Sequence, residues 1–216
     1  MTEQTADETA PSGDAAVDPA VAAGRSGAGA TSTPTPPRAR RVGLLAALAV
    51  GVLALDQATK TVALQQLEPG ERIPFIGDLL GWRLVFNPGA ALSFGTGHTW
   101  IFTIAMVVCA VVVISLATRI RSRGWAAAAG ALLGGALGNL VDRLARDPGF
   151  AVGHVVDFID YGVFIGNVAD IGIVAAAASF VLLTLLGISW DGTRERGKAS
   201  REDRVEAAPE RDGGAS

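Results

Sequence analysis

The chain has 216 residues, of which 50% are hydrophobic and only 18% are charged, and its mean hydropathy is +0.37 at a formal net charge of −3. Residues 42–190 hold only 9 acids and 8 bases, whereas about a quarter of the residues of an ordinary soluble domain are charged. This distribution excludes a soluble globule, a disordered chain and a nucleic-acid-binding protein built on a basic surface, and it indicates an integral membrane protein with polar tails.

The tails, residues 1–41 and 191–216, have compositions that cannot bury a core, so we expect both to be disordered. The first apolar run, residues 42–63, is long enough to span a bilayer, which needs about 20 residues. Because it is long and starts about forty residues into the chain, it favours a signal anchor over a cleaved signal peptide. Asp56 and Lys60 lie near its far end, one helical turn apart, and a simple helix salt bridge is the alternative to a functional role for them.

The connection after this helix contains two segments rich in β-forming residues, ERIPFI and LLGWRLVFN, which flank Gly77 and Asp78. This pattern predicts a small twisted hairpin or sheet on the membrane surface. The second apolar run, residues 99–118, is uncharged, and its Cys109 is interpreted as an apolar filler. A single cysteine excludes a disulfide framework and a cysteine-rich zinc site, and two histidines offer little for another metal, so we expect no metal and no cofactor.

The third apolar run, residues 125–144, carries glycines at a spacing of four: Gly130, Gly134 and Gly138. Such spacing lets helices approach closely, which we expect within the chain, with a dimer interface as the alternative. The run ends in three polar residues, of which the last also suits the negative end of the helix dipole. These residues are Asn139, Asp142 and Arg143.

The segment before the fourth run contains Asp157 inside the apolar, β-like sequence VVDFI, where a carboxylate has no structural task visible from sequence. Asp160, two residues later, is interpreted as a solvated loop acid. The fourth run, residues 168–190, follows Asn167 and contains Asp170 near its start. The spacing of these two residues also fits a helix N-cap followed by an acidic residue at the third helical position.

The cations near the helix ends predict the orientation. Arginines or lysines cluster before the first run, between the second and third runs, and after the fourth run. The positive-inside rule places these three segments in the cytoplasm, so the other two connections face outward. The predicted organisation is a disordered cytoplasmic tail over residues 1–41, a four-helix membrane domain over residues 42–190 and a disordered cytoplasmic tail over residues 191–216. The predicted fold class is therefore an all-α integral membrane protein with four transmembrane helices, N-in and C-in, and a small extracytoplasmic β-rich element between helices 1 and 2.

At 1.5 Å per helical residue, the polar residues of the successive segments fall at one depth, near the outer surface. Polar residues inside a membrane are costly and indicate function. Carboxylates at one water-accessible edge fit either acid–base catalysis by a carboxylate pair or the translocation of protons or ions. A relay would need polar groups across the whole membrane, whereas the inner halves of the helices are nearly pure Ala, Val, Leu, Ile and Gly. The one-sided placement favours catalysis or binding.

Five segments, in the order DQATK, NPGAALSF, GGALGNLVDRL, GHVVDFID and NVAD, resemble the motif blocks of bacterial lipoprotein signal peptidase, or signal peptidase II. The resemblance covers nearly all of residues 42–190. It implies a membrane-bound aspartic-type endopeptidase that removes the signal peptide from a diacylglyceryl-modified prolipoprotein, cutting before the lipidated cysteine. By motif, Asp157 and Asp170 match the catalytic dyad. The residues that match the surrounding polar groups are Asp56, Lys60, Asn87, Asn139, Asp142, Arg143 and Asn167.

The partners expected from this resemblance are lipid-modified prolipoproteins and membrane lipids, with no nucleic acid and no required metal or cofactor. We expect a monomer in the cell membrane whose active site faces the extracytoplasmic side. The sequence does not decide which carboxyl is the base. Two positions depart from the family pattern, since Leu92 and Gly166 stand where the family often has phenylalanine, and both change the shape of the pocket while leaving the chemistry alone.

Overall fold

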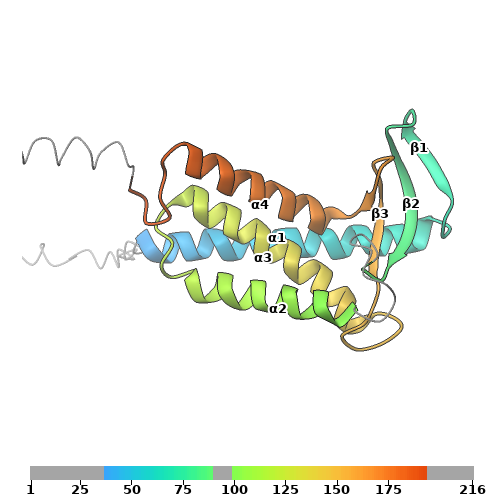
Figure 1. Cartoon of the computed structure of the whole chain (residues 1–216), viewed down its shortest axis with the longest axis horizontal. Coiled ribbons are helices and arrows are strands. Elements are labelled where there is room, and N and C mark those ends of the chain that lie inside the picture. Colours follow the sequence, from blue (N-terminus) through green and yellow to red (C-terminus); the bar gives the residue numbers. More distant parts are fainter. Residues whose placement is uncertain (1–36, 90–98, 194–216) are drawn as a thin grey trace, which may run out of the picture. The chain divides into compact units, whose positions relative to one another are not determined.

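The computed structural model describes residues 37–89 and 99–193 of the chain. Most of the predicted tails, and Leu92, therefore lie outside the described residues. Within the described residues, four helices are long and apolar enough to cross a membrane, which confirms the four predicted helices, and they run side by side as a bundle (Figure 1). They are α1 (Pro37–Gln66), α2 (Thr99–Leu116), α3 (Arg123–Ala145) and α4 (Val168–Leu185).

The largest differences from the predicted helix ends are five residues, at the start of α1 and at the end of α4, and the other ends agree within three residues. Helix α1 begins at Pro37 instead of Val42, because proline suits the first helical position, where an N–H group would have no helical partner. The last five residues of the predicted tail therefore belong to α1. Helix α4 ends at Leu185 rather than Trp190. Gly187 stops it, since this glycine adopts a left-handed conformation (φ 62°) and its N–H bonds back to the last helical turn.

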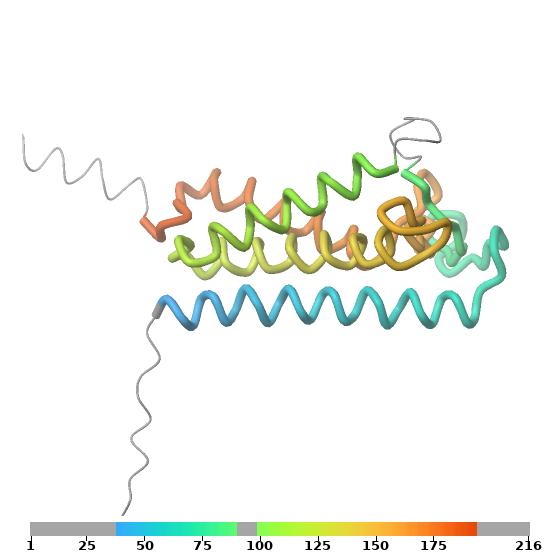
Figure 2. The backbone as a smooth tube through the Cα atoms, turned by 90° about the horizontal axis from the view of Figure 1, so that it is seen from below, coloured from blue at the N-terminus to red at the C-terminus, as the bar shows by residue number. Residues whose placement is uncertain are grey.

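Helix α3 is the most buried of the four and packs against α1, α2 and α4. Its glycines allow this. At Gly134 an added Cβ would lie 2.6 Å from the carbonyl oxygen of Ala49 in α1, and at Gly135 it would lie 2.5 Å from that of Ala169 in α4. Figure 2 shows α1 running along one side of the bundle beside the other helices. The predicted close packing therefore occurs within the chain.

The apolar core occupies one half of the bundle, the half away from the strands. It is built from the first half of α1 and of α3 and from the last half of α2, together with the link that follows α2. This separation leaves the other half of the bundle for polar residues. The core residues are Leu45, Ala49, Ala110, Val113, Ala117, Ile120, Ala126, Ala129 and Leu133.

A four-stranded antiparallel sheet in the order β1-β2-β3-β4 covers the opposite end (Figure 1). The predicted hairpin supplies the first two strands and turns at Gly77, whose φ of 50° is readily adopted by glycine. The other two strands come from the second outer connection, and Val85 pairs with Asp157 in the register. The sequence pattern placed the sheet only between the first two helices, because pairing between distant strands leaves no local signal. The strands are β1 (Arg72–Ile76), β2 (Leu80–Asn87), β3 (Val155–Asp160) and β4 (Ile165–Gly166).

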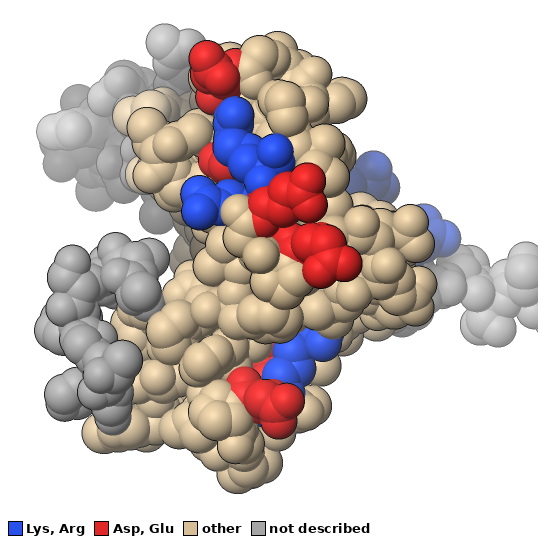
Figure 3. All heavy atoms as spheres, turned by 90° about the vertical axis from the view of Figure 1, so that its right-hand side faces the viewer, with Lys and Arg blue, Asp and Glu red and all other residues tan. Residues whose placement is uncertain are grey.

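The surface at the sheet end is largely uncharged. Figure 3 shows its charged side chains gathered in small groups on an otherwise uncharged face. The hairpin exposes large apolar side chains, among them Phe75 and Leu79. An apolar patch of this kind is typical of a surface that meets a membrane or a partner, and it favours the predicted position of the hairpin at the membrane surface.

Asp160 is not the solvated loop acid that the sequence indicated. It is the last residue of β3 and is buried, where its carboxylate accepts hydrogen bonds from the Gly162 N–H at 2.7 Å and the Arg72 Nε at 2.9 Å. Arg72 reaches it from β1 across β2, because Gly81 has no side chain to block the path. The hydrogen bond from Gly162, together with Arg72, lowers the pKa of Asp160.

Candidate active site

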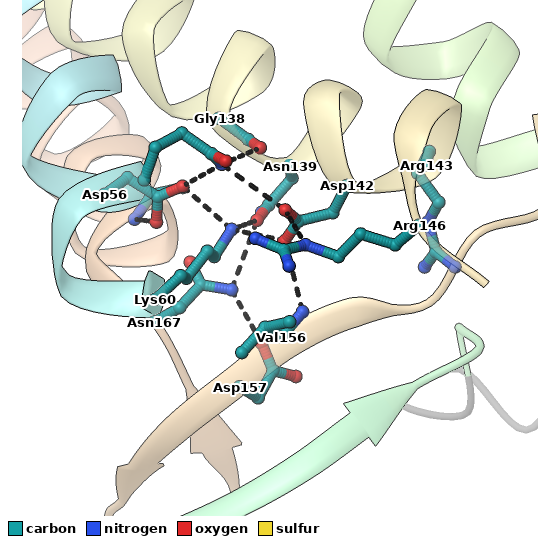
Figure 4. A network of polar contacts seen from close by, with 12 residues as sticks. Asp56, Lys60, Gly138, Asn139, Asp142, Arg143, Arg146, Val156, Asp157 and Asn167 are labelled. Carbon is teal, nitrogen blue, oxygen red and sulfur yellow. Dashed lines mark hydrogen bonds and ion pairs between the residues drawn. The ribbon is translucent and has the colours of Figure 1, made fainter. Parts of the chain in front are cut away.

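Asp157 and Asp170 come from different elements, and Asn167 contacts both residues, Asp157 through its side chain and Asp170 through a capping box. Figure 4 shows the contact between Asn167 and Asp157. Asp157 lies in the middle of β3, and Asp170 lies in the first turn of α4. The Asn167 Nδ2 donates to Asp157 Oδ1 at 2.6 Å. Asn167 and Asp170 also form a capping box, in which each side chain accepts the backbone N–H of the other at 3.0 Å. The capping alternative is therefore correct, and the cap itself brings the two carboxyl groups together.

Asn139 of α3 completes the connection between the two acids. Its Nδ2 donates to Asp170 Oδ1 at 2.9 Å, and its Oδ1 accepts a hydrogen bond from Asn167 Nδ2 at 3.1 Å. The two amides thus form a bridge that contacts both carboxyl groups. Asn139 and Asn167 are both buried, so their amide groups have fixed partners in place of water.

Lys60 anchors this bridge to α1 (Figure 4). Its Nζ lies 2.8 Å from Asp56 Oδ2, 2.8 Å from Asp142 Oδ2 and 2.9 Å from Asn139 Oδ1. All three ammonium hydrogens therefore have an acceptor. The side chains of Lys60, Asp56 and Asp142 are fully buried. The i,i+4 pair that the sequence indicated does form, and it is more than a surface salt bridge because Lys60 also joins α1 to α3.

The two carboxylates bound to Lys60 also hold the backbone of the elements that carry the acids. Asp56 Oδ1 accepts the N–H of Ala169 in α4 at 2.8 Å. Asp142 Oδ2 accepts the N–H of Val156 in β3 at 3.1 Å. The backbone next to Asp170 and the backbone next to Asp157 are thereby fixed to α1 and α3 respectively.

Arg143 and Asn87 have different relations to the acids. The Asn87 Nδ2 donates to Asp157 Oδ2 at 2.8 Å, so this residue contacts the dyad directly. Arg143 Nη1 donates to the Gly153 carbonyl oxygen at 2.9 Å, and its guanidinium lies 5.9 Å from the centroid of the Phe102 ring. Among the described residues, no hydrogen bond joins Arg143 to either acid. It holds the segment that leads into β3.

The sequence prediction missed two members of the network. Gln57 Nε2 donates to the Gly138 carbonyl oxygen at 2.9 Å and lies 3.3 Å from Asp142 Oδ1. Arg146 Nε pairs with Asp142 Oδ1 at 2.7 Å. Each carried a signal, since Gln57 stands inside the DQATK segment and Arg146 lies four residues after Asp142, the same spacing that singled out Asp56 and Lys60.

The electrostatics set Asp157 apart from an ordinary surface acid. Burial raises the pKa of Asp157 to about 6, against a hydrogen bond from Asn87 that lowers it, and the nearby Asp170 carboxylate adds to the rise. The cluster holds four carboxyl groups and the three cations Lys60, Arg143 and Arg146. A single proton on the carboxyl groups therefore makes the cluster neutral.

A pocket of about 680 Å³ opens over Asp157. Asn87 and Phe86 of β2 line one side, and Phe164 of the β3–β4 turn lines another. At Gly166, an added Cβ would lie 3.0 Å from Asp170 Oδ2 and 3.6 Å from the ring of Phe164. The ring of Phe164 therefore lies beside Gly166, the position where the family often has phenylalanine.

Among the described residues, no group of three or more His, Cys, Asp or Glu side chains is arranged to hold a metal ion. The acids of the cluster are instead partnered by amide groups, backbone N–H groups and the cations Lys60 and Arg146.

The sequence model of the family described as Signal peptidase (SPase) II matches residues 48–186. The chain belongs to the signal peptidase II family. The match covers all four helices in large part and includes every site residue described above. It confirms the predicted family of aspartic peptidases and the assignment of the chain as a membrane enzyme.

Three bacterial proteins named lipoprotein signal peptidase illustrate the similarity within this family. The protein of Rhodococcus jostii is 47% identical over 166 residues, which are 76% of this chain and 84% of that protein. The protein of Leifsonia xyli is 48% identical over 155 residues, 71% of this chain and 72% of that protein. The protein of Mycobacterium tuberculosis is 44% identical over 171 residues, 79% of this chain and 84% of that protein.

The fold is also similar to a solved structure described as a bacterial membrane enzyme determined by the in meso method at 1.9 Å resolution. The TM-score is 0.58 at 26% sequence identity, over 66% of this chain and 93% of that one. The four helices with a small sheet at one end are therefore the architecture of a known bacterial membrane enzyme.

Proposed function

We propose that this member of the signal peptidase II family uses Asp157 and Asp170 as a catalytic dyad. The substrate is a prolipoprotein, and the bond cut is the peptide bond before its lipid-modified cysteine. The observation that carries the proposal is the bridge through Asn167, whose side chain contacts Asp157 and whose capping box holds Asp170. The Asn167 amide binds the Asp157 carboxyl, and the neighbouring Asn139 amide binds the Asp170 carboxyl. Two carboxyl groups held next to each other in this way can share a proton, which is the requirement for an aspartic dyad.

The chemistry follows from unequal protonation of the two acids. The ionised carboxyl takes a proton from a water molecule as the water oxygen attacks the scissile carbonyl carbon, while the protonated carboxyl donates to the carbonyl oxygen. On collapse of the tetrahedral intermediate, the carbon–nitrogen bond breaks, the leaving amine takes a proton from one carboxyl, and one hydroxyl of the intermediate returns its proton to the other carboxyl, which restores the singly protonated dyad. The pair titrates as a unit, so the roles of base and acid belong to both residues jointly.

The charge balance of the cluster supports this protonation state. Four ionised carboxyl groups facing Lys60, Arg143 and Arg146 would leave one negative charge uncompensated in a buried site, which is costly. One proton shared by Asp157 and Asp170 removes that charge. The pKa of about 6 at Asp157 places its titration close to neutral pH, where one shared proton is easily held and easily given up.

The remaining network residues act as positioning residues in this proposal. Asp56, Lys60 and Asp142 fix the backbone beside each acid. Asn139 orients Asp170, and Asn87 orients Asp157 from the pocket side. Arg143 holds the loop that leads into β3. The roles that the resemblance implied for these residues thus have specific contacts to support them.

The site is proposed to face the extracytoplasmic side of the cell membrane. The dyad lies at the sheet end of the bundle, whereas the arginine-containing start of α1 and the link between α2 and α3 lie at the other end (Figure 1). The positive-inside rule places those segments in the cytoplasm. A pocket at the outer surface lets the acyl chains of the substrate stay in lipid while the scissile bond meets water.

The test is cleavage of a diacylglyceryl-modified prolipoprotein by the purified full chain and its variants. Asp157→Asn and Asp170→Asn are each expected to lower the cleavage rate by about 10²-fold to 10⁴-fold, because each removes the proton transfer of one dyad member. Asp147→Asn, an exposed acid outside the network, serves as the matched control and should cleave like the wild type. A metal chelator should have no effect.

Wild-type turnover by either folded dyad variant would refute the assignment of that residue. Inhibition by a chelator would refute the metal-independent mechanism. Circular dichroism of each variant distinguishes loss of chemistry from loss of folding.

A further inference from the structure

At the end of the bundle opposite the sheet, a pocket of about 730 Å³ gathers side chains from three separate segments. The start of α1, the link between α2 and α3, and the segment that follows α4 meet at this end (Figures 1 and 2). The proposed catalytic mechanism makes no use of this pocket. Its charged and aromatic lining residues are Arg38, Arg41, Arg119, Arg121, Trp190 and Asp191.

The backbone fixes the walls of this pocket. The carbonyl oxygen of Trp190 accepts the N–H groups of Arg121 at 2.9 Å and Ser122 at 3.2 Å. The indole N–H of Trp125, at the start of α3, donates to the carbonyl oxygen of Ile188 at 2.8 Å. The segment after α4 is therefore attached to the link between α2 and α3, and the pocket is part of the folded structure.

The charges of the lining are unbalanced. Among the described lining residues there are four guanidinium groups and one carboxylate, that of Asp191. Among residues 37–89 and 99–193, no ion pair involves Arg38, Arg119 or Arg121. Like charges gathered in one pocket repel one another, and an anion bound between them relieves this repulsion. Ion pairs among the described residues therefore do not explain why the fold gathers Arg38, Arg119 and Arg121 in one pocket.

The chemistry of the lining selects the kind of anion. Guanidinium groups bind phosphate through paired N–H donors. Tryptophan is enriched where membrane and water meet, and Trp190 is about half exposed. We propose that this pocket binds the phosphate group of an anionic phospholipid from the leaflet at this end of the bundle. Basic pockets between transmembrane helices are suited to such headgroups.

The test is native mass spectrometry of the full chain in detergent, titrated with phosphatidylglycerol and, separately, with zwitterionic phosphatidylcholine. The wild type should retain one phosphatidylglycerol molecule in clear preference to phosphatidylcholine. The double variant Arg38→Gln/Arg121→Gln should bind phosphatidylglycerol about thirtyfold more weakly, since two arginines near the lipid are lost. Circular dichroism should show that the variant is folded.

The matched control is Arg40→Gln/Arg123→Gln, which removes the same charge from two exposed arginines at the same end of the bundle but outside the pocket lining. This variant should bind phosphatidylglycerol within about threefold of the wild type. An equal loss in both double variants, or no loss in either, would overturn the pocket as the binding site. Equal retention of the two lipids, or displacement of phosphatidylglycerol by inorganic phosphate at similar concentration, would overturn the lipid as the ligand.

Discussion

The Asn167 side chain has two distinct tasks in the site. Its Oδ1 caps α4, and its Nδ2 lies within hydrogen-bond distance of both Asp157 and Asn139. The sequence predicts the first task, because an Asn three residues before an acid at a helix start is a capping pattern. It does not predict the second, since the approach of β3 to the start of α4 depends on the folded sheet. A capping residue and a dyad-bridging residue are here the same asparagine.

Asn87 offers a direct test of the environment of Asp157. Its hydrogen bond favours the ionised carboxylate and so lowers the pKa of Asp157 from the value that burial alone would give. In the Asn87→Ala variant the pKa of Asp157 should rise above about 6. The pH profile of kcat/KM should then move to higher pH by about one unit, whether Asp157 acts as base or as acid.

The shift is measured from the cleavage rates of the purified chain over about five pH units around neutrality, from about pH 4 to about pH 9. Asp147→Asn, outside the network, should leave the profile in place. An unchanged profile in Asn87→Ala, or a shift to lower pH, would contradict the account of the Asp157 pKa.

Asp160 shows why burial of a single residue is hard to predict. From sequence it resembles any acid at a loop boundary. Its burial depends on Arg72, which lies 88 residues earlier and crosses β2 at Gly81. Asp157, three residues away, was singled out from the sequence because a carboxylate inside an apolar run is unusual, and it lies buried in the middle of β3. The sequence shows that Asp157 differs from its apolar neighbours, but it does not show that Asp160 has a partner as distant as Arg72.

At the scale of elements, the glycines of α3 determine how closely the bundle packs. At Gly134 the added Cβ of Gly134→Ala would lie 2.6 Å from the Ala49 carbonyl oxygen and 2.7 Å from the Val52 Cβ. The backbones of α1 and α3 would have to move apart. We expect this variant to lose about 1–3 kcal/mol of stability and to unfold at a lower temperature in detergent.

The matched control for this prediction is Gly51→Ala in α1. An added Cβ at Gly51 meets nothing within 4 Å, and alanine favours the helix, so this variant should be as stable as the wild type or more stable. Thermal unfolding followed by circular dichroism compares the two. A Gly134→Ala protein that unfolds at the wild-type temperature would mean that close packing at this position is not required.

The sequence was informative about helices and less so about how elements combine. Hydrophobic runs located all four helices, and a glycine at position 187 was available as the signal that ends α4. The sheet was predicted only in part. Strands β3 and β4 pair with the β1–β2 hairpin, but α2 and α3 lie between them and that hairpin in the chain. Pairing of this kind depends on folded proximity rather than on local composition.

At the scale of the whole molecule, the orientation in the membrane is a separate prediction. The start of α1, the link between α2 and α3, and the end of α4 lie at one end of the bundle, and the first two of these segments carry most of the described arginines near the helix ends. A cytoplasmic reporter fused after Thr193 should therefore be active. The same reporter inserted at Gly149, in the connection after α3, should be silent.

The reverse pattern would place the dyad in the cytoplasm and contradict the proposed face of the enzyme. A folded fusion protein that still cleaves prolipoprotein is the control for each reporter position. The membrane orientation can be predicted from the sequence because it follows from the positions of a few cations near the helix ends.

The backbone N–H groups of Val156 and Ala169 end on carboxylates that are fully buried beside Lys60. Neither amide can exchange its hydrogen with solvent while those carboxylates remain in place. Exchange at the two positions therefore requires the polar half of the bundle to open. Deuterium uptake at these two amides, one in β3 and one in α4, reports the lifetime of the assembled site without any substrate present.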